Sequence, residues 1–108
     1  MTEFVLLIIS SSSEHESQEI ISTLLNKRLI ACANVSSKVT SSYWWKGNIE
    51  EADEFIITAK TRLSLVGKIT EEVKNIHSYE VPEILALPVL DGNKDYLDWL
   101  NDEITSDE

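Results

Sequence analysis

The sequence is poor in the residues that mark secreted, disulfide-rich or phosphate-binding proteins. Of its 108 residues, one is cysteine, two are proline and three are glycine. With Cys32 alone, no disulfide can form within the chain, although a small secreted domain usually depends on several. Three glycines are also too few for a glycine-rich phosphate loop. We therefore expect a cytoplasmic protein whose fold depends on a hydrophobic core.

Long apolar runs and basic residues are scarce as well. The longest apolar run, Phe4–Ile9, follows no basic stretch and is far shorter than the ~20 residues of a membrane span. Nine basic residues against 19 acidic ones give a formal net charge of −10. The basic residues are scattered, which disfavours binding to nucleic acid or to an anionic membrane surface. A negative surface attracts cations, but an acidic chain is also ordinarily more soluble, and we favour this second explanation of the charge.

The common catalytic motifs are absent from the sequence. It contains no Gly-x-Ser-x-Gly segment and no His-Glu-x-x-His segment. No nucleophile can be paired with a base from spacing alone. We therefore expect a protein that is not an enzyme.

Hydrophobic periodicity predicts one domain over residues 1–108, with strands and helices alternating. An apolar strand at 4–9 precedes a helix that a capping box of Ser13 and Glu16 opens. Alternation then predicts a half-exposed strand at 31–45 that places six residues on one face: Ala31, Ala33, Val35, Val39, Tyr43 and Trp45.

Strands and helices are also predicted in the second half of the sequence. A turn at 46–48 returns the chain as a hairpin strand at 49–61, and a second helix carries an apolar face from Leu65 to Ile76. A fourth strand at 84–90 and a short helix around Tyr96–Leu100 follow. The acidic residues 101–108 are expected to fray.

The resulting order, β-α-β-β-α-β with a terminal helix, predicts an α+β, ferredoxin-like antiparallel sheet. This topology places the first and third strands at the centre and the others at the edges. The apolar character of 4–9 and 55–59 suits central strands, and Pro88 suits an edge strand.

Two features predict an oligomer. The hairpin strands have roughly 13 residues each, or about 40 Å, which exceeds what a small domain needs. The central strands are also apolar on both sides, whereas the helices of this topology cover one face of the sheet. Other copies would bury the second face and the exposed edges. The alternative is a bent hairpin that folds back on its own sheet.

Several segments resemble one known family in order and spacing. They are Leu29-Ile-Ala-Cys-Ala-Asn-Val35, Tyr43-Trp-Trp-Lys-Gly-Asn-Ile-Glu50, Lys60-Thr61 and His77-Ser-Tyr-Glu-Val-Pro-Glu-Ile84. The chain from Phe4 to about Leu100 is similar to the CutA divalent-cation tolerance proteins. It departs from their pattern at Ser78, where the family usually has proline, and in having no cysteine besides Cys32, which argues against a site of several thiolates.

The resemblance implies a homotrimer that shares strands between subunits and is linked to tolerance of divalent metals, chiefly copper. Animal relatives are associated with the anchoring of a membrane esterase. The trimer is similar to PII signalling proteins, which bind small ligands between subunits. We therefore expect a copper-binding trimer, with zinc as the second metal. A PII-like ligand sensor, or a trimer that scaffolds an unknown protein partner, remain alternatives.

The candidate metal ligands are His77, Glu80 and Glu83, with Cys32 as a fourth. Imidazole and carboxylate groups suit Cu(II) or Zn(II). Their spacing across a turn matches no known ligand signature, so a purely structural turn is the alternative. A lone cysteine in a strand, such as Cys32, is more often a small buried hydrophobic residue than a metal ligand.

Aromatic and charged residues near the hairpin form a candidate ligand cleft. The six residues are Tyr43, Trp44, Trp45, Glu50, Lys60 and Tyr79. The aromatic side chains could stack on a ligand or anchor a subunit interface. The acidic run Glu50–Glu54 lacks the pattern of a calcium loop, so a solvated or ion-paired face is expected there.

Overall fold

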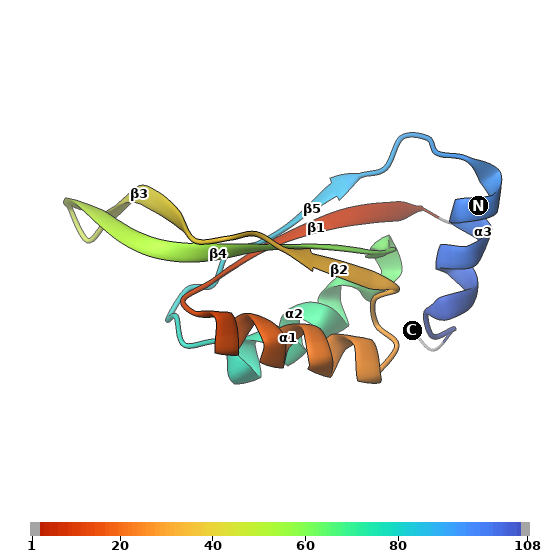
Figure 1. Cartoon of the computed structure of the whole chain (residues 1–108), viewed down its shortest axis with the longest axis horizontal. Helices are drawn as coiled ribbons and strands as arrows, with labels where there is room; N and C mark the ends of the chain where they lie inside the picture. The colour runs from red at the N-terminus through yellow and green to blue at the C-terminus, as the bar shows by residue number, and fades with distance from the viewer. Residues whose placement is uncertain (1–2, 107–108) are drawn as a thin grey trace.

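A computed structural model describes residues 3–106 of the chain. In the described part, strands and helices alternate as the sequence predicts, and the second predicted strand is divided into two (Figure 1). The elements are β1 (Phe4–Ser11), α1 (Glu14–Asn26), β2 (Cys32–Val35), β3 (Val39–Trp45), β4 (Asn48–Arg62), a 3-10 turn (Leu63–Leu65), α2 (Val66–Ile76), β5 (Ile84–Pro88) and α3 (Lys94–Glu103).

The sheet is antiparallel, with the strand order β2-β4-β1-β5 and with β3 paired to the far half of β4. The strands predicted to be central, β1 and β4, are central. Pro88 lies in the edge strand β5, where a missing backbone N–H does not interrupt the hydrogen bonds between the central strands. Helices α1 and α2 both lie on one face of this sheet, and α3 lies at the end opposite the hairpin tip (Figure 1). The ferredoxin-like prediction is confirmed.

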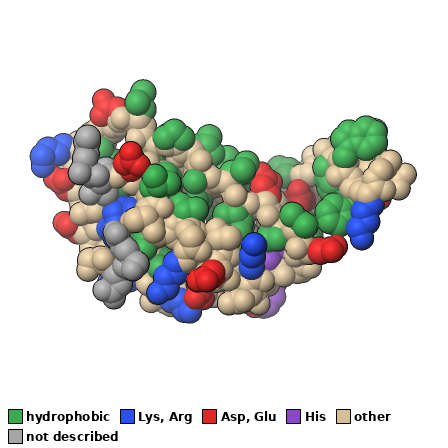
Figure 2. All heavy atoms as spheres, turned by 180° about the vertical axis from the view of Figure 1, so that it is seen from behind, with side chains coloured by type: hydrophobic (Ala, Val, Ile, Leu, Met, Phe, Trp, Pro, Cys, Tyr) green, Lys and Arg blue, Asp and Glu red, His purple; other side chains and the backbone are tan. Residues whose placement is uncertain are grey.

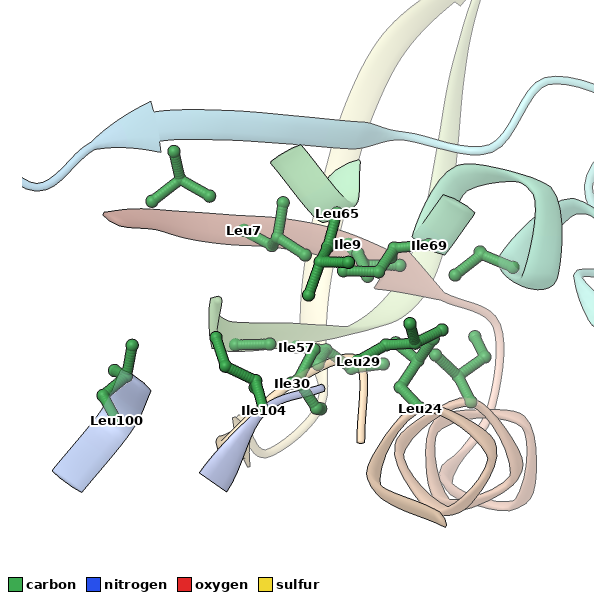
Figure 3. Packing of buried hydrophobic residues seen from close by; sticks show 14 residues of the cluster. Leu7, Ile9, Leu24, Leu29, Ile30, Ile57, Leu65, Ile69, Leu100 and Ile104 are labelled. Carbon is green, nitrogen blue, oxygen red and sulfur yellow. The ribbon is translucent and has the colours of Figure 1, made fainter. Parts of the chain in front are cut away.

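The hydrophobic core lies between the sheet and the two covering helices (Figure 3). Alternate residues of β1, namely Val5, Leu7 and Ile9, point into it and are at most 3% exposed. Ile57 from β4 meets them with no exposed surface. The alternation of side chains along each central strand thus decides which residues the helices bury.

The other side of the sheet is covered by no helix. Its apolar side chains, which we call the open face, are Leu6, Ile8, Ile56, Leu85 and Leu87. Leu85 and Leu87 are 52% and 42% exposed. Figure 2 shows hydrophobic side chains gathered along the side away from the helices and at the hairpin tip. The predicted exposed apolar face is therefore present.

The hairpin contains a β-bulge that the sequence did not reveal. Val35 pairs with Ile57 but Val39 pairs with Glu54, so four steps along one strand match three along β4. The extra residue reverses the side of the sheet that each side chain of β3 faces. Tyr43 therefore lies on the opposite side of the sheet from Val35, and the prediction of one continuous face from 31 to 45 is wrong.

The hairpin tip projects from the domain, which measures 44 × 25 × 23 Å (Figure 1). A two-residue turn closes it, with φ of 49° at Lys46 and 85° at Gly47. Positive φ at both positions is typical of a type I′ turn, which suits the twist of the strands. The hairpin therefore does not fold back on its own sheet.

The end of the chain is better ordered than expected. Helix α3 continues to Glu103, and Ile104 is only 5% exposed within the core. The backbone N–H of Thr105 donates to the Arg28 carbonyl at 2.7 Å. Fraying from residue 101 is therefore wrong for 101–106, because an apolar side chain fastens this segment; residues 107–108 lie outside the described residues. No helix in the described part is long and apolar enough to span a membrane.

Candidate functional site

A pocket of about 700 Å³ lies where the hairpin leaves the sheet, beneath the segment that joins α2 to β5. Its residues come from three strands and from the connecting segment. They are Ser10 of β1, Ser41, Ser42, Tyr43 and Trp45 of β3, Glu54 of β4, and Ser78, Tyr79, Glu80, Val81 and Glu83 of the connecting segment. Strand alternation places Ser10 and Glu54 on the same side as the open face, so the pocket borders that face.

A buried carboxylate and a phenol form the polar centre of the pocket. Glu54 is only 7% exposed. The hydroxyl of Tyr79 lies close enough to its carboxylate for the two groups to interact. Burial, and then this neighbouring negative charge, raise the pKa of Tyr79 above its usual range. Tyr79 therefore stays protonated and acts as a hydrogen-bond donor at physiological pH.

His77 holds the start of the connecting segment against β1. Its side chain has no exposed surface. Nε2 lies 2.6 Å from the Ser10 carbonyl oxygen, and Nδ1 accepts from the Tyr79 backbone N–H at 3.0 Å. A carbonyl only accepts and a backbone N–H only donates, so the proton is on Nε2 and the ring is neutral. Both nitrogens are therefore occupied by structural hydrogen bonds.

Glu16 connects the start of α1 to the same segment. Its carboxylate accepts from the backbone N–H of Ser12 at 2.9 Å and of Ser78 at 2.8 Å. Burial alone would raise the pKa of Glu16, but these hydrogen bonds outweigh it and lower the pKa. Ser13 accepts from the Glu16 N–H as predicted, although the Glu16 carboxylate reaches Ser12 instead of the Ser13 N–H of an ordinary capping box.

The comparisons with known proteins agree with this architecture. The model of the family described as "CutA1 divalent ion tolerance protein" matches residues 5–103. The chain belongs to this family.

Relatives of this CutA1 family member come from bacteria, archaea, plants and animals. The divalent-cation tolerance protein CutA of Thermus thermophilus is 41% identical over 94% of this chain and 97% of its own length. Protein CutA of Mus musculus is 44% identical over 86% of this chain. The chain spans about half the length of the mouse and human relatives, 52% and 51%.

Solved structures of the family superimpose closely on this fold. The Thermus thermophilus protein has a TM-score of 0.92 at 38% identity, covering 94% of this chain and 99% of its own. CutA1 from Oryza sativa has a TM-score of 0.93 at 32% identity, covering 96% and 95%. The periplasmic divalent cation tolerance protein CutA of Archaeoglobus fulgidus has a TM-score of 0.91 at 37% identity, covering 94% and 99%.

The four candidate metal ligands of this family member do not come together. Glu80 and Glu83 line the pocket, whereas His77 is buried with both nitrogens engaged. Cys32 pairs with Lys60, six residues along β4 from Glu54, or about 20 Å away. Metal ligands lie ~2–2.5 Å from their ion. A site built from all four residues of one chain is therefore excluded by this geometry.

Cys32 instead belongs to a small cluster at the other end of the sheet. Its sulfur lies 3.7 Å from Lys60 Nζ and 3.7 Å from the Tyr96 hydroxyl. Burial would lower the pKa of Lys60, but Cys32 and Tyr96 outweigh this effect and raise it. Cys32 is partly exposed, so the alternative of a fully buried apolar residue does not hold either. Residues 3–106 contain no group of three or more acidic, histidine or cysteine side chains arranged to hold a metal.

Half of the predicted ligand-cleft residues line the pocket. Tyr43, Trp45 and Tyr79 do so. Trp44 points to the other side of β3 and is 72% exposed, while Glu50 lies nearer the tip, opposite Tyr43, and Lys60 lies beside Cys32.

The sequence prediction missed Glu54 and the serines of β1 and β3. The acidic run Glu50–Glu54 predicts a solvated or ion-paired face, whereas Glu54 is buried. Residues 50–54 are acidic except for Ala52, so no period of two in the sequence marks Glu54 as buried.

Proposed function

We propose that this CutA1 family member binds copper or a similar divalent ion as a homotrimer and takes part in the response to metal ions. The observation that carries the proposal is that Glu54, Glu80 and Glu83 line the same pocket of an acidic chain. Carboxylate oxygens are ligands for divalent cations, with copper the first expectation and zinc the second. The names of the Thermus thermophilus and Archaeoglobus fulgidus relatives refer to the same class of ions.

The open face supports the trimer. An uncovered apolar sheet face and the edge strands β2 and β5 are features that monomers usually hide. The pocket borders this face, so a second copy seated there would bring its own side chains near Glu80 and Glu83. We propose that the ligands missing from one chain come from the neighbouring subunit.

The expectation of a cytoplasmic protein without catalytic activity forms part of the proposal. It rests on the lone cysteine and on the missing catalytic motifs. The name of the Archaeoglobus relative contains the word periplasmic, so localisation is a point to measure by fractionation of the native host.

Native mass spectrometry with limiting Cu(II) tests the metal proposal. We expect a trimer that takes up about one ion per subunit. The double variant Glu80→Gln/Glu83→Gln should lose these ions, whereas Cys32→Ser should keep them. Glu19→Gln/Glu71→Gln removes the same charge from the surface of α1 and α2 and serves as the matched control. A bare trimer contradicts the metal role, and a monomer contradicts the assembly.

A small-ligand sensor of the PII-like kind is the second candidate function. The pocket volume of about 700 Å³ favours it, since ligand pockets typically measure ~300–1,000 Å³. Three aromatic rings line this pocket, as is common in sites for organic ligands. A thermal-shift screen of metabolites against metal-free protein tests this candidate. A screen in which no compound stabilises the protein would refute it.

A further inference from the structure

The lining of the pocket is anionic and aromatic. Three carboxylates and three aromatic rings face it, together with four serines. No lysine, arginine or histidine is among the lining residues that the structure describes. A ligand with phosphate or carboxylate groups would bring like charges together in a partly desolvated site. The chemistry of the pocket therefore selects a cation.

An ammonium group of the chain itself already lies at this site. Lys46 Nζ is 5.5 Å from the centroid of the Trp45 ring and 4.0 Å from the Glu80 carboxylate. An aromatic face with a carboxylate beside it is a recurring arrangement for organic ammonium ions. Lys46 comes from the hairpin turn and its side chain is 71% exposed. An incoming amine can therefore replace it without disturbing the fold.

The inner part of the pocket offers a second anionic position. Glu54 is 7% exposed, and the Tyr79 hydroxyl interacts with its carboxylate. A carboxylate accepts up to about four hydrogen bonds. Ser41, on the same side of the hairpin as Glu54, adds a hydroxyl acceptor. A ligand with N–H donors at both ends can thus contact Glu54 inside and Glu80 at the rim.

Within one chain, the geometry suits an organic cation better than a bare metal ion. No three metal-ligating side chains of residues 3–106 converge as an ion would require. An ammonium on a carbon chain needs no such convergence, because its contacts are hydrogen bonds of ~2.7–3.2 Å and ring contacts of up to ~6 Å. We propose that this pocket binds a small aliphatic di- or polyamine. The inference rests on the small-ligand candidate function and is independent of copper binding.

Calorimetric titration of the full chain, stripped of metal with a chelator, tests the inference. The probe is 1,4-diaminobutane, with 1,4-butanediol and succinate as neutral and anionic controls at equal ionic strength. We expect saturable binding of the diamine that weakens as salt rises, and none of the controls. Binding of the diol with equal affinity, or no heat from the diamine, would overturn the proposal.

Variants locate the site. Trp45→Leu and Glu80→Gln/Glu83→Gln should each weaken the diamine roughly tenfold or more, since each removes a cation contact. The control Glu19→Gln/Glu71→Gln should bind as the unmodified protein does. Lys46→Gln removes the internal competitor and should bind the diamine several-fold more tightly; equal or weaker binding contradicts the proposal. Circular dichroism checks that each variant is folded.

The two proposals fail separately. Copper uptake without diamine binding overturns the amine inference and leaves the proposed metal function intact. Diamine binding without copper uptake overturns the proposed metal function and supports the amine inference.

Discussion

Replacing Glu16 by glutamine should destabilise the protein at neutral pH and spare it in acid. The carboxylate of Glu16 connects three segments, because it accepts from the backbone N–H groups of Ser12 and Ser78 and lies 3.9 Å from His77 Nε2. Its side chain is 10% exposed, so water replaces these contacts poorly. Glutamine keeps the shape but offers one accepting oxygen and no charge.

The size of the effect follows from the bonds that change. Hydrogen bonds to a charged group contribute about 1.5 to 3 kcal/mol each, against about 1 kcal/mol for neutral ones. In Glu16→Gln, one backbone N–H loses its acceptor and the other faces a neutral one. We expect a loss of about 2 to 3 kcal/mol in the free energy of unfolding at pH 7.

The stability difference between the protein and Glu16→Gln should change with pH in a defined direction. The pKa of Glu16 is lowered in the folded protein from an ordinary value of 4.5. Its contribution to stability is therefore complete above pH 4.5 and is lost as the pH falls through the folded-state pKa. The stability difference between the protein and Glu16→Gln should thus be largest at pH 7 and shrink below 4.5.

Urea denaturation at fixed protein concentration from pH 7 down to 3 measures this difference. Glu19→Gln is the matched control, since Glu19 lies on the same helix with 48% of its side chain exposed. It should change stability by no more than ~0.5 kcal/mol. A Glu16→Gln effect that is equal at both ends of the pH range, or larger in acid, would refute the reasoning.

Three further changes probe the core, the hairpin turn and the buried histidine. Ile57→Ala should cost about 2 to 5 kcal/mol in urea denaturation because Ile57 is fully buried, whereas Ile49→Ala, 66% exposed, should cost under ~1 kcal/mol. Gly47→Ala should cost about 1 to 2 kcal/mol because its φ is 85°. Gly67→Ala, inside α2, should instead stabilise by up to ~1 kcal/mol, and equal signs for the two would contradict this. His77→Gln should lower stability by about 1 to 3 kcal/mol but leave copper uptake in native mass spectrometry unchanged, and lost uptake would contradict the structural role assigned to its ring.

Ser78, which departs from the family pattern, forms a hydrogen bond that proline could not form. The resemblance expects proline after His77, and proline has no backbone N–H. The N–H of Ser78 donates to Glu16 at 2.8 Å. This chain therefore replaces a rigid turn residue with a hydrogen bond, a contact between residues 62 positions apart that no local pattern predicts.

The candidate site was only partly predictable for the same reason. Tyr43, Trp45, Tyr79, Glu80 and Glu83 were named from their chemistry and do line the pocket. The expected metal roles of His77 and Cys32 failed as a joint site because residue type alone does not reveal burial, hydrogen-bond partners or separation along a strand.

The sequence by itself determined the order of elements, the central and edge strands, the long hairpin and the family. These follow from periodicity, from proline and turn residues, and from motif order, all of which act over a few neighbouring residues. Tertiary structure alone decided the site. One extra residue between Val35 and Val39 moves Tyr43 and Trp45 to the side of Glu54. Such a bulge is defined by the pairing of two strands, so it exists only once the chain has folded.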